Sequence, residues 1–234
     1  MMRRNRHASG DARPDQRALA APARRRSTCR RRDQRGAAAV EAALLTPLLM
    51  LVLFGIIEMS LFMRDVVSVS SSVHVGTRMA SVAAGAGPAT CTPSPCTPPT
   101  APALAQLAAN AIQQAGSAMP QDQINWIEIY NANSSGFPLP AGNTSSTCST
   151  DCVKYVWSAG SNQFVYSSGS WSSASINACI NDPNRMSVGV IMNARHPWIT
   201  GLFGNGATVQ ERSVMQFEPL TSDSCKPGTP NAHS

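Results

Sequence analysis

The sequence predicts an α+β fold in which a long N-terminal transmembrane helix precedes a small antiparallel sheet, packed with one or two helices and carrying disulfides. Three observations predict it. An apolar segment without charge lies near the N-terminus, short runs of alternating apolar and polar residues follow residue 120, and six of the seven cysteines come after the apolar segment. Together these features indicate a membrane anchor followed by an exported domain.

The positive charge of the chain is concentrated in its N-terminal arm. Residues 1–36 carry twelve Arg against three Asp, whereas the rest of the chain carries seven Lys or Arg against ten acidic residues. The formal net charge of +6 therefore describes a short arm, and the body is mildly acidic. No aromatic residues are interleaved with the Arg clusters, so we expect no nucleic-acid partner.

The apolar segment is long enough to cross a membrane. Residues 42–57 hold no charge, and the low-charge stretch 37–63 is interrupted only by Glu41 and Glu58. Because a helix rises 1.5 Å per residue, about 20 residues span the hydrocarbon core. The apolar side chains of residues 40–57 contribute roughly −3 to −7 kcal/mol to insertion, against up to about +3 kcal/mol for a central acid. Insertion is favoured, and we expect Glu58 to reach water at the outer end.

The flanking charges predict the orientation of this helix. Arg clusters crowd its N-terminal side, while Arg64 and Asp65 cancel beyond it. The positive-inside rule then keeps the N-terminus in the cytoplasm and places the C-terminal domain outside the cell membrane, as a single-pass protein. A cleaved secretory signal is the weaker interpretation, because its apolar core is usually about 7–15 residues long.

The junction of the arm and the helix carries a family resemblance. Residues 35–45 read RGAAAVEAALL, and this run resembles the N-terminus of TadE-like (TadE/TadG-type) minor pseudopilins of the tight-adherence (Flp) pilus system. The resemblance continues at residues 76–80 and returns faintly at residues 186–219. It implies that a prepilin peptidase cuts between Gly36 and Ala37. It also implies other pilin-like subunits and tight-adherence assembly proteins as partners.

Glu41 has a physical interpretation that does not depend on the family. A carboxylate one turn into an apolar helix is costly unless it is paired. After cleavage, the α-amino group of Ala37 would lie about 6 Å from Glu41 along the helix axis. A neighbouring subunit could supply such an amine to Glu41, which would favour lateral packing of helices in one register. The alternative is that Glu41 is simply solvated at the cytoplasmic interface.

The cysteines after the helix favour disulfides. Cys29 lies in the basic arm, and the six disulfide candidates are Cys91, Cys96, Cys148, Cys152, Cys179 and Cys225. Six thiols allow 15 pairings. Zinc is the competing interpretation, but the spacings of the first two pairs are loose for a zinc knuckle and no His lies nearby. We expect Cys91 and Cys96 to close a small loop in the Pro/Thr-rich connection.

The chain is expected to fall into five segments. These are a basic cytoplasmic leader (1–36) that is expected to be disordered, the membrane helix with its extension (37–85), a Pro/Thr-rich linker (86–102), an extracytoplasmic α+β domain (103–220) and a disordered tail (221–234). The extension carries an apolar stripe that we expect to rest on the domain, formed by Val66, Val69, Val73, Gly76, Met79 and Ala80. A second helix is predicted over residues 104–115, ending at Gly116.

Short runs rich in β-branched and aromatic residues predict the sheet. The expected strands lie at residues 124–130, 153–157, 164–166, 186–192 and 207–217. The last two form a hairpin across HPWITGLFGNG, residues 196–206, whose apolar tip is unusual for a solvent loop. Three outcomes stay open for it: packing against the protein itself, folding as a short helix, or contact with the membrane or a partner subunit.

No arrangement of residues predicts an active site. The four His residues are scattered, and no phosphate-binding loop, HExxH or GxSxG motif is present. The Ser-rich residues 167–175 are expected to form a loop. We therefore expect no enzyme, no cofactor and no metal. The sequence predicts a pseudopilin-like role in pilus assembly or its secretion machinery, or alternatively a membrane-tethered module that binds an extracytoplasmic ligand outside a filament.

Overall fold

The computed structural model describes residues 31–89, 101–116, 119–201, 203–221 and 225. It contains two α-helices, α1 (Arg31–Val82) and α2 (Ala103–Ala115). Five strands follow: β1 (Ile124–Ala132), β2 (Cys152–Ser158), β3 (Gln163–Ser170), β4 (Ser187–His196) and β5 (Ala207–Gln216). A long apolar helix, an antiparallel sheet and a second helix confirm the predicted fold class.

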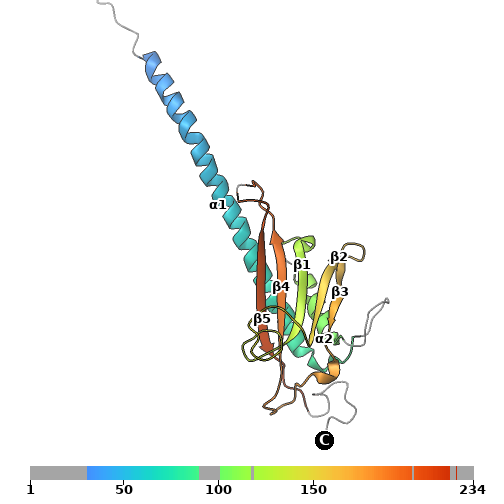
Figure 1. Cartoon of the computed structure of the whole chain (residues 1–234). Helices are drawn as coiled ribbons and strands as arrows, with labels where there is room; N and C mark the ends of the chain where they lie inside the picture. The colour runs from blue at the N-terminus through green and yellow to red at the C-terminus, as the bar shows by residue number, and fades with distance from the viewer. Residues whose placement is uncertain (1–30, 90–100, 117–118, 202, 222–224, 226–234) are drawn as a thin grey trace, which may run out of the picture. The chain divides into compact units, whose positions relative to one another are not determined.

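The five strands form one antiparallel sheet in the order β3-β2-β1-β4-β5 (Figure 1). β4 and β5 pair along their whole length, from Ser187 opposite Gln216 to His196 opposite Ala207. This confirms the predicted hairpin. β1 lies at the centre between β2 and β4, so β3 and β5 are the two edges. The turn between β4 and β5 comes directly after His196.

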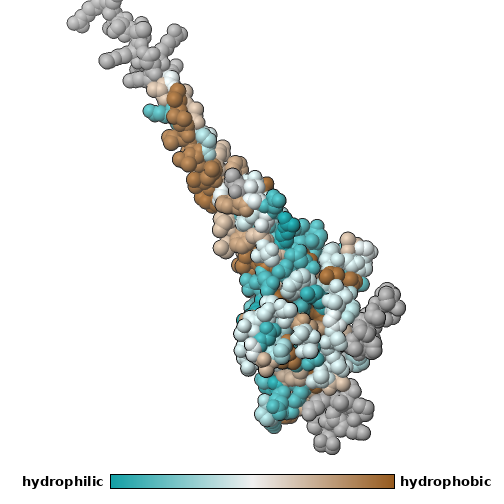
Figure 2. All heavy atoms as spheres, viewed as in Figure 1, coloured by the Kyte–Doolittle hydropathy of each residue, from teal (hydrophilic) through white to brown (hydrophobic). Residues whose placement is uncertain are grey.

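Helix α1 belongs to two units of the structure, residues 1–49 and residues 50–234, which are described separately. In both, the apolar side chains of α1 from Val40 to Ile57 are exposed, including Leu44 at 72% and Ile56 at 60%. Brown, apolar residues accordingly line α1 in Figure 2. In the most apolar 18-residue segment of α1, no residue is buried by the described part of the chain, whereas a core helix of a soluble protein would be mostly buried. This is a candidate membrane-spanning helix.

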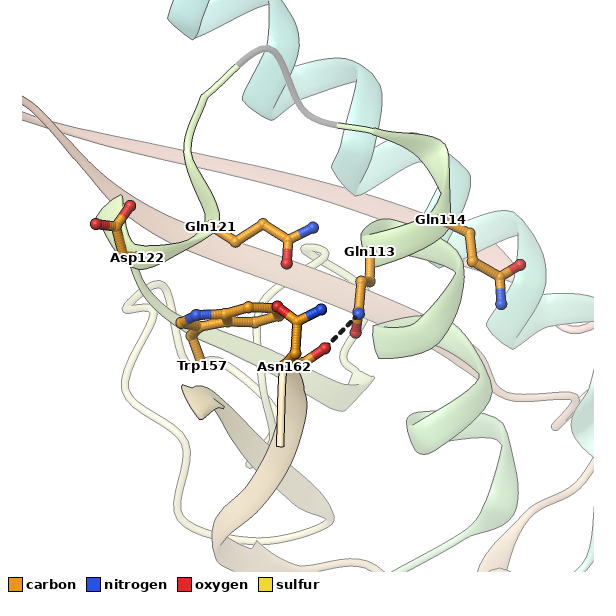
Figure 3. Close-up of a pocket in the computed structure, with 6 residues that line it drawn as sticks. All are labelled: Gln113, Gln114, Gln121, Asp122, Trp157 and Asn162. Atoms are coloured by element: carbon orange, nitrogen blue, oxygen red, sulfur yellow. Dashed lines mark hydrogen bonds between the residues drawn. The ribbon is translucent and has the colours of Figure 1, made fainter. Parts of the chain in front are cut away.

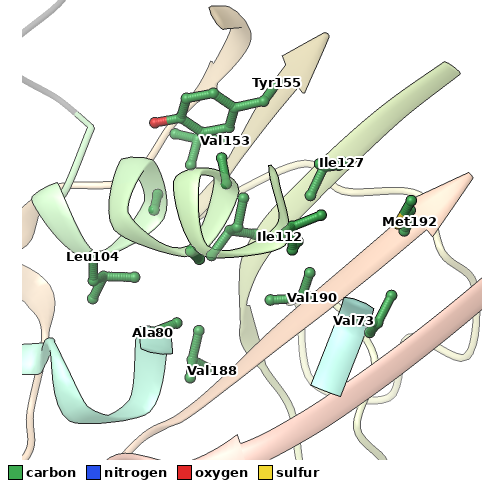
Figure 4. Close-up of a cluster of buried hydrophobic side chains, with 14 of the residues drawn as sticks. Val73, Ala80, Leu104, Ile112, Ile127, Val153, Tyr155, Val188, Val190 and Met192 are labelled. Carbon is green, nitrogen blue, oxygen red and sulfur yellow. The ribbon is translucent and has the colours of Figure 1, made fainter. Parts of the chain in front are cut away.

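The C-terminal half of α1 and helix α2 bury one face of the sheet. Val73 and Ala80 from α1 and Ile112 from α2 lie over apolar side chains of β1, β2 and β4 (Figure 4). The predicted stripe on α1 is buried at Val69, Val73, Gly76 and Ala80, but Met79 is 39% exposed. Met79 was therefore wrongly included, because the buried face passes through Thr77 and Ala80 instead.

Gly76 allows α1 and α2 to approach closely. A Cβ atom at this position would lie 2.6 Å from Cδ1 and 2.7 Å from Cγ1 of Ile112, which is itself buried. Real Cβ atoms essentially never come this close, so with any larger residue the Ile112 side chain or the two helices must shift.

Substitution Gly76→Val is expected to lower the free energy of unfolding by about 1–3 kcal/mol, because overpacking forces the two helices apart. Denaturant unfolding of the full chain in detergent micelles, followed by tryptophan fluorescence, measures this loss. Gly55→Val is the control, since Gly55 lies in the same helix and no atom lies within 4 Å of the position that its Cβ would take. Equal losses in both variants would contradict the role of Gly76.

The opposite face of the sheet is covered by the long connection between β1 and β2. Tyr130 is fully buried there, packs with Cys152 and Ile191, and donates a hydrogen bond to the carbonyl of Gly136 at 2.9 Å. Burial raises the pKa of Tyr130 to about 12. Gly189 on β4 lies opposite Tyr130, where a side chain would collide with the phenol ring.

Two disulfides lie in the described part of the chain. Cys148 pairs with Cys152 at the start of β2, and Cys179 pairs with Cys225, which is buried. The first pairing excludes the zinc interpretation for Cys148 and Cys152. Cys29, Cys91 and Cys96 lie outside the described residues, so the expected loop between Cys91 and Cys96 stays a prediction.

Strand β3 is longer than the sequence predicts. It continues through Ser170, so the first half of the Ser-rich run is strand rather than loop. Gly169 explains part of this: its φ is +97°, and a Cβ there would lie 2.3 Å from the carbonyl oxygen of Cys152. Pairing with β2 therefore extends β3 where the local preference of Ser and Gly would end it.

Candidate functional site

The most distinctive polar site lies where α1 meets the turn between β4 and β5. We call residues 197–201 and 203–206 the β4–β5 tip. Glu58 is 1% exposed, and its Oε1 accepts hydrogen bonds from the backbone N–H of Thr200 at 2.5 Å and from the Thr200 hydroxyl at 2.7 Å. The expectation that Glu58 reaches water was wrong, because the tip covers this carboxylate and supplies two donors.

A buried hydrogen bond between a histidine and a carboxylate forms two helical turns further along α1. His196 Nδ1 donates to Asp65 Oδ2 at 2.6 Å, and the two side chains are 4% and 8% exposed. Asp65 Oδ1 also contacts Arg64 Nη2 at 3.2 Å. Since burial of an unpaired carboxylate is costly, this pairing ties α1 to the end of β4.

Aromatic rings fill the space between the two polar contacts. Phe62 lies 5.5 Å from the His196 ring and 5.5 Å from Trp198, and Trp198 meets His196 edge to face at 4.7 Å. These residues form one cluster, the helix–tip junction, made of Glu58, Phe62, Asp65, His196, Trp198 and Thr200. Packing of Trp198 and Thr200 on α1 shows that the tip packs on the protein at these two residues.

Sequence reasoning did not find the helix–tip junction. Glu58, Phe62 and Asp65 are spaced by four and three residues, which places them on one face of a helix. Two acids on one face of an otherwise apolar helix need partners, and that spacing was the available signal. The partners could not be identified, because His196 and Thr200 lie more than 130 residues away in the sequence.

The residues predicted to take part in processing and assembly lie on α1. Gly36, Ala37 and Glu41 are all within the helix and exposed, and no atom lies within 4 Å of a Cβ built on Gly36. Within the described residues, these three positions are not covered by the sheet domain. The processing and packing roles of these residues stay predictions.

A polar pocket of about 540 Å³ opens beside the C-terminal end of α2, and none of its lining residues belongs to the helix–tip junction. It is lined by the end of α2, the turn before β1, the end of β2 and the β2–β3 turn. Figure 3 shows the indole of Trp157 in the middle, with the side chains of Gln121 and Asn162 beside it. Gln113 donates to the Asn162 carbonyl at 2.9 Å, which joins α2 to the β2–β3 turn. An aromatic plate surrounded by amides suits a polar organic ligand.

A third buried acid lies on the face of the sheet opposite to the helices. Glu128 on β1 is 4% exposed and stands opposite Lys154 on β2, with 3.4 Å between its Oε2 and Lys154 Nζ. Lys154 also lies over the Trp126 ring at 4.6 Å from the centroid. Burial raises the pKa of Glu128, and the Lys154 charge opposes this shift without cancelling it.

The raised pKa of Glu128 predicts a pH dependence of stability. The folded state holds the Glu128 proton more tightly than the unfolded state, so stability from this group is lost as the pH rises from the ordinary value of about 4.3 through the raised pKa. Glu128→Gln is expected to remove this decline. Unfolding titrations at several pH values test it, with the exposed Asp122→Asn as control. An unchanged pH profile in Glu128→Gln would contradict the prediction.

Neither of the two described His residues belongs to a candidate metal or catalytic cluster. His74 is exposed and bonds to the Ser213 hydroxyl at 3.0 Å, whereas His196 pairs with Asp65. Within residues 31–89, 101–116, 119–201, 203–221 and 225, no group of three His, Cys, Asp or Glu side chains could hold a metal ion.

Comparison with known families identifies the N-terminal segment. The family model described as TadE-like protein matches residues 36–78, which confirms the resemblance over this segment. The match begins at Gly36 and includes Glu41, Glu58 and Asp65; the fainter resemblance at residues 186–219 stays an expectation. No curated protein and no solved structure gives a significant match. Residues 36–78 are thus a TadE-like segment, of a family that is associated with the tight-adherence pilus system and is generally non-enzymatic.

Proposed function

We propose that this chain is a pseudopilin-like membrane protein that takes part in assembling a tight-adherence pilus or its secretion machinery. The observation that carries the proposal is the TadE-like match at residues 36–78, which starts at the proposed processing site and covers most of the candidate membrane helix. The exposed apolar surface of α1 supports it, because such a surface can be covered by lipid in the membrane and by neighbouring helices in an assembly.

The proposed orientation has the N-terminus in the cytoplasm and the sheet domain outside. The Arg-rich arm before α1 supports it through the positive-inside rule. The disulfides between Cys148 and Cys152 and between Cys179 and Cys225 agree with an oxidising compartment for the sheet domain.

Processing by a prepilin peptidase is proposed at the bond between Gly36 and Ala37. Gly36 lies in the first two turns of α1, where glycine costs about 1 kcal/mol of helix stability relative to alanine. This makes local opening of the helix around the bond easier, as a peptidase requires. Cleavage would leave Glu41 as the fifth residue of the mature chain.

N-terminal sequencing of the protein extracted from membranes tests the proposal. The expected mature chain begins at Ala37 in cells with an active prepilin peptidase and retains its leader when the peptidase is absent. Gly36→Val should block cleavage, whereas Ala42→Val, on the same helix beyond Glu41, should not. A mature terminus other than Ala37, or cleavage independent of the peptidase, would count against processing.

Co-purification tests the role of Glu41 in assembly. Glu41→Gln is expected to enter the membrane normally but to lose most of its association with other pilin-like subunits, because the amide cannot pair with an α-amino charge. The control is Thr46→Val, which removes a different polar group from the same helix. The Thr46 hydroxyl donates a hydrogen bond to the carbonyl of Ala42 within the helix, so its loss should leave association unchanged. Undiminished association of Glu41→Gln would favour the solvated alternative.

The alternative function is a membrane-tethered module that binds an extracytoplasmic ligand without joining a filament. The pocket around Trp157 favours it, since aromatic and amide side chains suit a polar organic molecule. The two functions separate experimentally. Trp157→Ala should abolish function if the pocket is responsible, whereas loss of pilin partners or of the prepilin peptidase should abolish it if the chain acts in pilus assembly.

A further inference from the structure

The β4–β5 tip has the reverse of the polarity expected for a loop in water. Ile199 is 74% exposed and Phe203 is 53% exposed. In contrast, the Thr200 hydroxyl and N–H point to α1 and bond with Glu58. A loop surrounded by water gains by burying large apolar groups and hydrating its polar groups. Ile199, Phe203 and the two donors of Thr200 do the opposite, whereas Trp198 packs on α1.

The exposed side of the tip continues the apolar surface of α1. Phe203 and helix residues from Val52 to Met63 line one groove of about 530 Å³, whose exposed lining is almost entirely apolar. On the helix side, Ile56 is 60% exposed and Met63 is 55% exposed. The groove is therefore formed jointly by the tip and by the candidate membrane-spanning helix.

The length of α1 places this groove at the edge of a bilayer. At 1.5 Å per residue, a span of about 20 residues that begins at Val40 ends near Met59. The next charged pair along the helix, Arg64 and Asp65, follows about one and a half turns later. Trp198 packs between the tip and the helix at this level, and tryptophan is enriched where acyl chains give way to headgroups.

We propose that the β4–β5 tip inserts into the bilayer leaflet nearer to the sheet domain, with Ile199 and Phe203 as anchors and lipid acyl chains in the groove. Lipid is the occupant because the groove is continuous with the apolar helix surface that the membrane itself covers. Insertion also accounts for Glu58. Its carboxylate stands at the edge of the hydrocarbon, where the tip covers it and hydrogen-bonds it instead of leaving it in lipid.

This inference rests on α1 crossing a membrane and goes beyond the proposed role in pilus assembly. The tip becomes a second contact with the bilayer beside the helix. Two contacts restrain the sheet domain from rotating against the bilayer, because Asp65–His196 joins the end of β4 to the helix and Glu58–Thr200 joins the tip to it.

Quenching by brominated lipids tests the insertion. The full chain carrying Phe203→Trp is reconstituted in phosphatidylcholine vesicles with or without bromine in the acyl chains. The fluorescence of the unsubstituted chain in the same vesicles is subtracted, which leaves the emission of the added indole. The expected result is loss of most of this emission in brominated vesicles. Ile180→Trp is the matched control, because Ile180 is equally exposed at 55% but lies beyond the other end of β4; its indole should keep its emission.

A second measurement covers the case in which Phe203→Trp does not fold. In vesicles, Trp198 should be shielded from aqueous iodide, and the double substitution Ile199→Ser with Phe203→Ser should make it accessible. Equal quenching of both tryptophan variants by brominated lipid, or none of either, would overturn the proposal. Emission at position 203 that instead changes with protein density at constant lipid would also overturn it, since a second copy would then occupy the groove.

Discussion

Replacing His196 with Ala is expected to lower the free energy of unfolding by about 3–5 kcal/mol, because it leaves a buried carboxylate without its nearest partner. Asp65 is 5% exposed and would retain only the contact to Arg64 at 3.2 Å, whose side chain is largely in solvent. The loss includes the ring contacts of His196 with Phe62 and Trp198. Denaturant unfolding of the full chain in detergent micelles measures it.

His74→Ala is the matched control for this prediction. His74 also makes one hydrogen bond between α1 and the sheet, to Ser213 at 3.0 Å, but it is exposed. Its loss should be only about 1 kcal/mol. The double variant Asp65→Leu with His196→Leu should lose much less than the two single substitutions together, since it removes both polar groups. Equal effects of His196→Ala and His74→Ala would refute the importance of the buried pair.

Removing the disulfide between Cys179 and Cys225 is expected to lower stability by about 4 kcal/mol, because it frees a long loop in the unfolded chain. The two cysteines are 46 residues apart, and the loop that they close contains the whole β4–β5 hairpin. Backbone hydrogen bonds between residues 178–180 and Leu220 and Cys225 lie beside the bond. The double substitution to Ser should therefore loosen the open end of the hairpin, where β4 begins and β5 ends.

The disulfide between Cys148 and Cys152 supplies the control. Its sequence separation is 4, so the same loop-entropy relation gives a loss of only about 2 kcal/mol. Denaturant midpoints of both double Ser variants, with and without reductant, test the difference. Reductant should shift the unsubstituted chain towards the Cys179 and Cys225 variant. A larger loss from the short loop than from the long one would contradict the prediction.

Local sequence patterns predict most of the fold, because the spacing of apolar residues differs between helices and strands and can be read from a short segment. The stripe through Val69 and Val73 identified the buried face of α1, and Gly116 ends α2 in a left-handed conformation, as expected. The alternation in β4 and β5 predicted their hairpin. Met79 was wrong because the buried face of α1 runs through Thr77 and Ala80. The Ser-rich end of β3 was wrong because pairing with β2 overrode the local preference.

The site could not be predicted to the same degree, because its contacts join distant parts of the chain. An acid on a helix face signals that a partner is needed, but periodicity does not say which residue supplies it. Asp65 and His196 are 131 residues apart, and Glu58 and Thr200 are 142 apart. The strand order that brings β4 beside α1 is likewise absent from any local pattern. The pocket around Trp157 needs α2, β2 and two turns together.

The polar end of β3 also bears on how these domains behave when crowded. β3 is an edge strand, and Ser167, Ser168 and Ser170 expose their side chains there beside Gly169. An unpaired edge strand exposes backbone groups to which another strand can pair, and residues with poor strand preference make that pairing less favourable. Many copies held side by side on one surface would thus pair less readily through this end of β3, leaving association to other parts of the molecule.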